Sequence, residues 1–355
     1  MLLSLLLSTS AHAAELEPYA MGQMWVTLYD MDEAAQADPA GYGDPEDDPG
    51  FKLRRARLGM VRPAEFGATP AERLGVSMIL GMSAGSDPIP FAATGQLGLI
   101  DANISYAANE NLTVYGGLVK VPWGRENQFS SLQLPFQDRT VQSNHMVSLR
   151  EVGALAVWNA PANLRVQGGV YNGNGSLLGD EDNLFLFAGR VDWTLGGDHS
   201  QAYRSFGVVD APVIGVGADV VYNDEAAVDE LVVGGDLIFR MKGLTVIGEG
   251  HWARLTPTDT TVVDPAVLAQ TTRIGAYAQV GYTVADRWEP VVRWETFDED
   301  TALSDNGDLM HTYAGVTGHF LEDKLRVGGG YVLRMETGGA NISNDTARLW
   351  IQGTY

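Results

Sequence analysis

Hydrophobic and polar residues alternate along the chain in sixteen segments of about ten residues each. A tilted strand of about ten residues crosses the hydrocarbon core of a bilayer. No linker or shift in composition divides the series, so we predict a single domain. The expected strands are 20–30, 51–62, 72–84, 98–107, 111–121, 148–158, 163–172, 184–194, 212–223, 230–241, 243–254, 272–283, 288–297, 308–320, 324–335 and 346–355.

The facing of the side chains distinguishes a membrane barrel from other β structures. In the expected strand 324–335, Arg326 and Arg334 share one face, and the opposite face carries Leu325, Val327, Tyr331, Leu333 and Met335. An apolar face toward lipid and a polar face toward a wet lumen is typical of transmembrane barrels. A soluble sandwich also alternates, so the repetition of this pattern along the chain is the informative observation.

The connections between the expected strands alternate in length. If the N-terminus is periplasmic, odd connections are external loops and even connections are periplasmic turns. The odd connections are mostly long and the even ones mostly short, with 195–211 as the exception. We therefore predict an all-β fold, a transmembrane antiparallel β-barrel of about 16 strands in the bacterial outer membrane.

Composition agrees with this prediction and limits the function. Glycine is abundant at 42 residues, and only 19% of residues are charged. The net charge of −22 argues against a nucleic-acid partner, because a phosphate backbone would be repelled. Carboxylates concentrate between Asp30 and Asp48, in an expected external loop, so much of the acidic excess is assigned to the outer rim.

The two ends of the sequence predict export to the outer membrane. Residues 1–13 read M-L-L-S-L-L-L-S-T-S-A-H-A and are expected to form a signal peptide, leaving 14–355 as the barrel domain. A buried N-terminal strand or helix is the alternative interpretation. The last strand ends on Tyr355 and resembles the C-terminal strand by which outer-membrane barrels are recognised for insertion.

One segment is too polar for a core and too apolar for an ordinary surface loop. It reads K-V-P-W-G-R-E-N-Q-F-S-S-L-Q-L-P-F-Q-D-R-T-V over residues 120–141 and follows the fifth expected strand. This segment and F-K-L-R-R-A-R-L-G at 51–59 resemble the phosphate-selective porin O and P family. The resemblance is patchy, extends from residue 51 to the C-terminus, and implies a trimeric outer-membrane porin whose third loop folds into the lumen.

The resemblance assigns a constriction loop. Glu126 and Asp138 are expected to fasten it to the wall, whereas Lys120 and Arg125 are expected to contact permeant anions through charge-assisted hydrogen bonds. The full set is Lys120, Arg125, Glu126, Ser130, Ser131, Asp138 and Arg139.

The inward phase of the expected strands carries more basic than acidic residues. The expected lumen-lining residues are Arg55, Arg57, Arg165, Arg190, Arg240, Arg273, Arg293, Arg326 and Arg334. Arg54 falls on the opposite phase and is expected to point outward. The alternative for each arginine is a pair with a neighbouring carboxylate of the wall, such as Asp192 beside Arg190.

These residues predict passive diffusion of small solutes through a water-filled lumen, with a preference for phosphate-like anions. A structural or adhesive barrel with acidic loops that bind calcium or lipopolysaccharide is the alternative. An enzyme is not expected, because the histidines show no catalytic motif. No cofactor is expected, and metal binding stays open. The expected partners are outer-membrane lipid, lipopolysaccharide, small anionic or mixed solutes, and two further copies of the chain.

Overall fold

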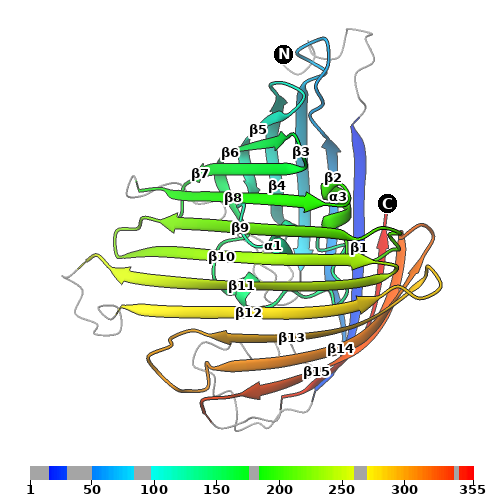
Figure 1. Ribbon diagram of the computed structural model, residues 1–355, viewed down its shortest axis with the longest axis vertical. Helices are drawn as coiled ribbons and strands as arrows, with labels where there is room; N and C mark the ends of the chain where they lie inside the picture. The colour runs from blue at the N-terminus through cyan, green and yellow to red at the C-terminus, as the bar shows by residue number, and fades with distance from the viewer. Residues whose placement is uncertain (1–15, 30–49, 84–96, 176–183, 260–269, 340–343) are drawn as a thin grey trace.

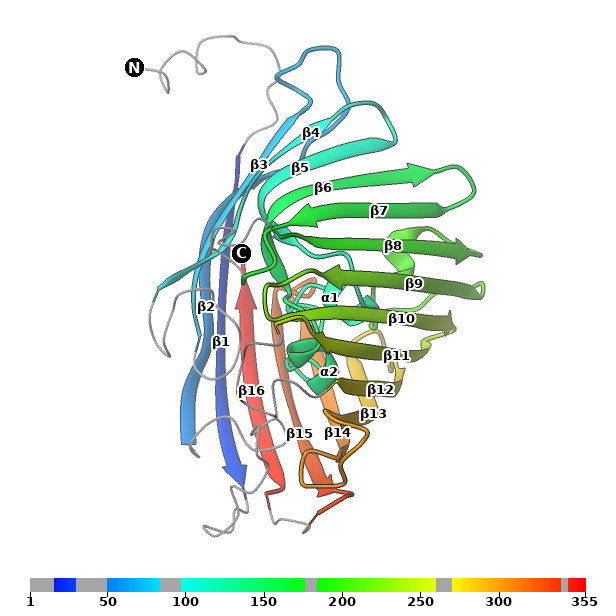
Figure 2. The ribbon, with the colours of Figure 1, turned by 90° about the vertical axis from the view of Figure 1, so that its left-hand side faces the viewer.

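A computed structural model describes residues 16–29, 50–83, 97–175, 184–259, 270–339 and 344–355. The expected signal peptide and the acidic loop at 30–49 lie outside these residues. The described residues form sixteen antiparallel strands, each paired with its neighbours in sequence, and β1 pairs with β16 to close the barrel (Figures 1 and 2). The predicted fold class is confirmed.

The strands are β1 (Glu17–Tyr29), β2 (Gly50–Arg62), β3 (Leu74–Ser83), β4 (Gly98–Ala107), β5 (Leu112–Lys120), β6 (Arg150–Ala160), β7 (Leu164–Tyr171), β8 (Leu186–Leu195), β9 (Val213–Asn223), β10 (Val228–Met241), β11 (Leu244–Pro257), β12 (Thr271–Tyr282), β13 (Trp288–Asp298), β14 (Leu309–Phe320), β15 (Leu325–Glu336) and β16 (Thr346–Thr354). Each overlaps its predicted range. The hairpin of β10 and β11 is longer than predicted, because its pairing continues as far as Val228 opposite Pro257.

Three short helices are described: α1 (Arg125–Gln128), α2 (Val141–His145) and α3 (His199–Ala202). None of the described helices has the length and apolar character to span a membrane. The tightest connection lies between β10 and β11, where Lys242 and Gly243 both adopt positive φ angles of 50° and 86°. Positive φ at both central residues matches the right-handed twist of the strands and favours glycine.

The wall has an apolar outside and a polar inside. Leu58 and Leu349 are about two-thirds exposed, whereas Arg190, Arg293 and Arg326 are almost fully buried. A polar side chain sits on the inner face where water or a partner group solvates it. The apolar packing of the inner side lies between the wall and the segment that follows β5, rather than between two stacked sheets.

Arg54 was predicted to point outward, and the structure shows that this prediction is wrong. The pairing of β1 with β2 shifts between Gln23 and Met24, so that Arg54 is an extra residue of β2 at this point. A β-bulge of this kind leaves two adjacent side chains on one face. Arg54 and Arg55 are both buried, and Arg54 donates to Asp138 Oδ1 at 3.2 Å. The strict alternation assumed for this strand was wrong at the bulge.

Candidate functional site

The segment after β5, residues 121–149, is the most buried connection of the described chain, and we call it the third loop. Val121 and Trp123 are fully buried. Trp123, Val141 and Met146 belong to one apolar cluster with wall residues of β6 to β8, and Phe129 and Leu134 belong to a second with Ile238 and Ile247. Both α1 and α2 lie within this segment, alongside β9 to β13 (Figure 2).

The start of the third loop is fastened to β8–β11. Arg125 Nε donates to Asp236 Oδ1 at 2.5 Å, and Arg125 Nη2 lies 3.7 Å from Asp192 Oδ1. The backbone N–H groups of Gly124 and Glu126 donate to Asp219 Oδ2 and Glu249 Oε2 at 3.0 and 2.9 Å. These carboxylates satisfy groups at the beginning of α1 that have no partner within the helix.

Glu126 joins both halves of the third loop to β13. Its Oε2 accepts from the backbone N–H and the hydroxyl of Thr140 at 2.8 and 2.7 Å. Its Oε1 accepts from Arg293 Nη1 at 3.3 Å. Arg293 also donates to the carbonyl of Asp138 at 3.1 Å, so this one arginine holds two points of the loop.

Asp138 fastens the loop where the barrel closes. Arg54 of β2 and Arg348 of β16 both pair with its carboxylate, and both guanidinium groups lie over the ring of Trp25. Burial alone would raise the pKa of Asp138, but Arg348 and Arg54 lower the pKa to about 2. Asp138 therefore stays ionised at any pH at which the protein is expected to work.

The middle of the third loop contacts β14 and β15. Thr317 donates to the carbonyl of Pro135 at 2.9 Å, and Arg326 donates to the carbonyls of Leu132 and Leu134. Together with the contacts above, these bonds tie the loop to β2, β8–β11 and β13–β16. Trp25 of β1 also donates to Gln137, and α2 packs against β12 and β13. Two cavities lie along the rest of the wall, β3–β7.

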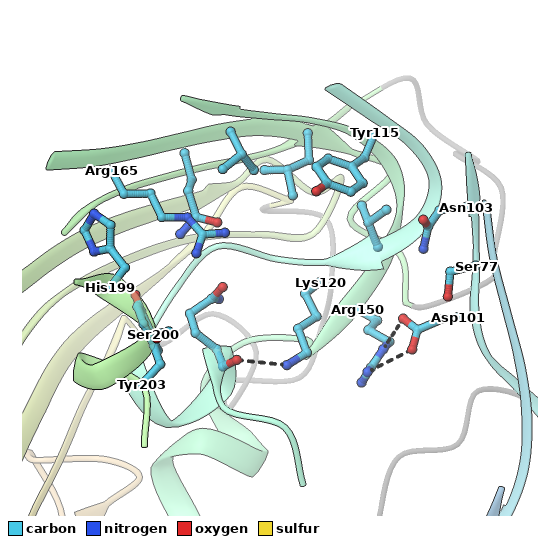
Figure 3. Close-up of a pocket in the computed structure, with 15 residues that line it drawn as sticks. Ser77, Asp101, Asn103, Tyr115, Lys120, Arg150, Arg165, His199, Ser200 and Tyr203 are labelled. Carbon is cyan, nitrogen blue, oxygen red and sulfur yellow. Dashed lines mark hydrogen bonds and ion pairs between the residues drawn. The ribbon is translucent and has the colours of Figure 1, made fainter. Parts of the chain in front are cut away.

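The two cavities have volumes of about 570 and 250 Å³ and share the wall residues Asp101, Lys120 and Arg150. Figure 3 shows the larger one, with Arg165 and His199 on one side, Arg150 and Asp101 on the other, and Lys120 between them. Among the described residues that line either cavity, Asp101 is the only acidic one. The basic lining residues are Arg57, Lys120, Arg139, Arg150 and Arg165.

Neutral oxygens orient several of these cations. Lys120 Nζ donates to the carbonyls of Asn127, Gln128 and Phe129 at 2.9, 3.2 and 3.0 Å. Arg139 Nη2 donates to the same Phe129 carbonyl at 3.0 Å, and Arg57 Nη1 donates to Ser131 Oγ at 2.8 Å. A carbonyl or a hydroxyl fixes the position of a cation without cancelling its charge. Arg150 pairs with a carboxylate on this side, with its Nε 2.9 Å from Asp101 Oδ1.

The connection between β8 and β9, residues 196–212, meets the third loop and was not assigned to the site from the sequence. Arg125 Nη1 donates to the carbonyl of Ala202 at 2.9 Å, and Tyr203 packs edge-on against Phe129 with 5.9 Å between ring centroids. Arg240 holds this connection by donating to the carbonyls of Gln201, Phe206 and Gly207. The anomalous length at 195–211 was the signal that could have found it.

The predicted lumen-lining arginines divide into two groups. Arg57 and Arg165 line the two cavities against β3–β7. The others contact the third loop, the β8–β9 connection or neighbouring wall groups: Arg55, Arg190, Arg240, Arg273, Arg293, Arg326 and Arg334. The predicted loop residues Ser130 and Ser131 line the smaller cavity. The sequence did not predict Arg150 and Arg348 as site residues. Both lie near the beginning of a strand, where the alternation of inward and outward side chains has no fixed starting point.

Metal binding was left open from the sequence. Within the described ranges, no group of three or more histidine or carboxylate side chains is arranged to hold a metal ion. The acidic residues at 30–48 lie outside those ranges.

Solved structures resemble the whole chain in fold. OmpT of Vibrio cholerae, an outer membrane protein in a trimer form, has 12% identity and a TM-score of 0.61, covering 96% of this chain and 99% of its own. An anion-selective porin from Comamonas acidovorans has 11% identity and a TM-score of 0.57, covering 96% and 99%. The outer membrane channel DcaP of Acinetobacter baumannii has 12% identity and a TM-score of 0.57, covering 98% and 99%.

The sequence comparisons give no match: neither a model of a known protein family nor a curated protein matches the chain. At identities of 11–12% the structural likeness concerns the fold. The resemblance to the phosphate-selective O and P family therefore stays a prediction beyond that fold. The chain has the closed sixteen-stranded fold of bacterial outer-membrane porins, and the predicted outer-membrane location follows from this architecture.

Proposed function

We propose that the protein is an outer-membrane porin that lets small solutes diffuse passively and prefers anions. In this proposal the third loop narrows the lumen, and the aqueous path runs between that loop and β3–β7. The observation that carries the proposal is the charge balance of the two cavities there. Five basic residues, Arg57, Lys120, Arg139, Arg150 and Arg165, line them with Asp101 as their acidic counterpart among the described residues.

The net charge of −22 does not contradict an anion preference. Low-dielectric walls focus the field of nearby charges into a narrow path, so the charges at the constriction act on a permeating ion more strongly than distant ones. Much of the acidic excess belongs by sequence to external loops such as 30–49. These loops would affect ion entry at the rim, and the basic path would set the preference at the narrowest point.

Resemblance to other proteins supports three finer assignments: the anion preference, the homotrimer and the phosphate-like solutes. The anion-selective porin of Comamonas acidovorans supports the anion preference, and the trimer form of Vibrio OmpT supports assembly into a homotrimer. The resemblance of 51–59 and 120–139 to the phosphate-selective family supports phosphate-like solutes. The apolar outer face would contact outer-membrane lipid, and the acidic external loops would meet lipopolysaccharide.

The reversal potential of the full-length protein in planar bilayers, under a KCl gradient, tests the proposal. We expect the sign of an anion-preferring channel. The double variant Lys120→Glu and Arg139→Glu should reverse that sign, because it exchanges two cations of the path for two anions.

The matched control is Lys242→Glu, which makes the same kind of charge change in the exposed turn between β10 and β11. It should leave the reversal potential unchanged. A cation-preferring wild type would contradict the proposal. A wild type without measurable conductance would favour the structural or adhesive barrel instead.

A further inference from the structure

The larger cavity has an apolar surface where a water-filled lumen would normally present polar groups. Leu155 and Val157 are buried, and they alternate along β6 with exposed residues of the outer face, so both side chains point inward. Val119 of β5 is buried beside them, and all three line the cavity. Each side chain keeps less than a tenth of its surface exposed, so the apolar area open to the cavity is small, and it favours a solute that covers it with hydrocarbon.

Aromatic rings extend this apolar surface. Tyr115 of β5 borders the patch at one edge of the cavity, and Tyr203 of the β8–β9 connection lies at another (Figure 3). Tyr203 is held in place by Phe129 and by Arg125, whose guanidinium carbon lies 5.0 Å from the ring centroid. A planar or aliphatic body can pack against these rings, whose positions are fixed before a solute arrives.

Cationic and hydrogen-bonding groups surround the same surface. Lys120 and Arg150 approach from β5 and β6, and Arg165 approaches from β7 on the opposite side (Figure 3). A volume of about 570 Å³ is within the range of small-molecule sites. The lining combines the apolar residues and the two tyrosine rings with a larger number of polar and charged side chains. Inorganic phosphate would use the cations and leave the apolar patch uncovered.

We propose that this cavity is a solute-binding site for small carboxylates with a hydrocarbon body, aromatic or aliphatic. The carboxylate would pair with Lys120 or the neighbouring arginines, and the body would cover Val119, Leu155 and Val157. The inference rests on the proposed anion preference and specifies the solute class that this preference serves. It assigns the specificity of the pore to the inner face of β5 and β6.

Block of single-channel current in planar bilayers tests the site, with the full-length protein and three separate probes: benzoate, inorganic phosphate and neutral benzyl alcohol. We expect benzoate to block half of the current at a concentration about tenfold below that of phosphate. Benzyl alcohol should block least, because it covers the patch but does not use the cations.

Two substitutions separate the apolar patch from the charges. Val157→Thr keeps the shape of the side chain and adds a hydroxyl, and Leu155→Asn is a second variant with the same direction of change. Each should raise the half-blocking concentration of benzoate about three- to tenfold and leave that of phosphate unchanged. Val332→Thr is the matched control, because Val332 is equally buried on the inner face of β15 and does not line the cavity.

The outcomes distinguish the two proposals. Equal block by benzoate and phosphate, with no selective effect of Val157→Thr or Leu155→Asn, overturns the carboxylate site and leaves the anion preference intact. A cation-preferring reversal potential overturns the anion preference itself. Unchanged single-channel conductance of each variant before a probe is added verifies that the barrel has folded.

Discussion

The two sides of the third loop use the same residue types for opposite purposes. Toward β8–β16 and β2, arginines such as Arg125, Arg293 and Arg54 meet carboxylates, and the pairs hold the loop. Toward β3–β7, Lys120 and Arg139 are positioned by backbone carbonyls. Carbonyl acceptors also hold the loop, as at Arg326, but unlike a carboxylate they do not neutralise the charge of the cation, so the charge of Lys120 can act on the path. The kind of acceptor is therefore more informative than the position of the basic residue alone.

The largest expected effect comes from breaking the fastened side at Arg125. Arg125 Nε and Arg190 Nη2 lie 2.5 and 2.6 Å from the buried carboxylate of Asp236, and Arg190 also pairs with Asp192 and Asp219. In Arg125→Leu, Arg190 therefore faces three buried carboxylates, and we expect a cost of about 3 kcal/mol, at the lower end of the range for removing one partner of a buried pair. We expect a lower temperature for the loss of the folded band on cold-loaded gels, together with a larger and noisier single-channel conductance.

The control for that variant is Arg254→Leu, at an exposed residue whose guanidinium donates to Gln270. It should change neither the gel transition nor the conductance. If Arg125→Leu behaves in the same way, the fastened side contributes little and the contrast between the two sides fails.

A smaller effect is expected at Asp138, where two cations share one carboxylate. Asp138→Asn keeps the volume of the side chain but removes the charge that Arg54 and Arg348 meet, which should cost about 1.5–3 kcal/mol. Burial works against ionisation, but the two arginines lower the pKa of Asp138 to about 2. The stabilisation is therefore complete above the usual aspartate range near pH 4, and it is lost as the pH falls through about 2.

The pH dependence provides the measurement for Asp138. The difference in unfolding temperature between the native protein and Asp138→Asn should be constant from pH 7 to about pH 4 and should shrink below that. Asp101→Asn is a useful comparison, because Asp101 pairs with Arg150 on the cavity side. It should change the reversal potential more than the unfolding temperature. If Asp101→Asn changed mainly the unfolding temperature and Asp138→Asn mainly the reversal potential, the contrast between the two sides of the third loop would be contradicted.

The smallest expected effect concerns His199, which lines the larger cavity from α3. Burial and then the nearby Arg165 and Arg125 lower the pKa of His199, against the opposing effect of Asp192, so the ring is neutral at pH 7. Protonation at lower pH adds a positive charge beside Arg165. We expect a modest increase in anion preference as the pH falls below the ordinary histidine range near 6.5, and His199→Gln should remove it. An equal increase in that variant would assign the effect to other groups.

Much of the fold could be predicted because the barrel imposes a simple rule on each strand. Side chains alternate between lipid and lumen with period two, so all sixteen strands overlapped their predicted ranges. The rule failed at Arg54, where the bulge opposite Gln23 and Met24 adds one residue to β2. A bulge depends on the pairing with the neighbouring strand, and the alternation within one strand does not reveal it.

The site was harder to predict, because its partners are remote in sequence. The position of the third loop could be inferred from its mixed composition and its place after the fifth strand. The partners of Arg125 could not, because Asp236 and the Ala202 carbonyl are far along the chain. The β8–β9 connection was noticed for its length alone, and its contacts with Phe129 and Arg125 depend on the closed barrel.

The bonds that hold the third loop also have a consequence for assembly. Thr317 with Pro135, Arg326 with Leu132 and Arg348 with Asp138 join residues separated by 182, 194 and 210 positions. Contacts of such long range form late in folding, because the intervening chain must first be ordered. The third loop cannot dock on these partners until β14, β15 and β16 are in place. We therefore expect docking of the third loop to be a late step of folding.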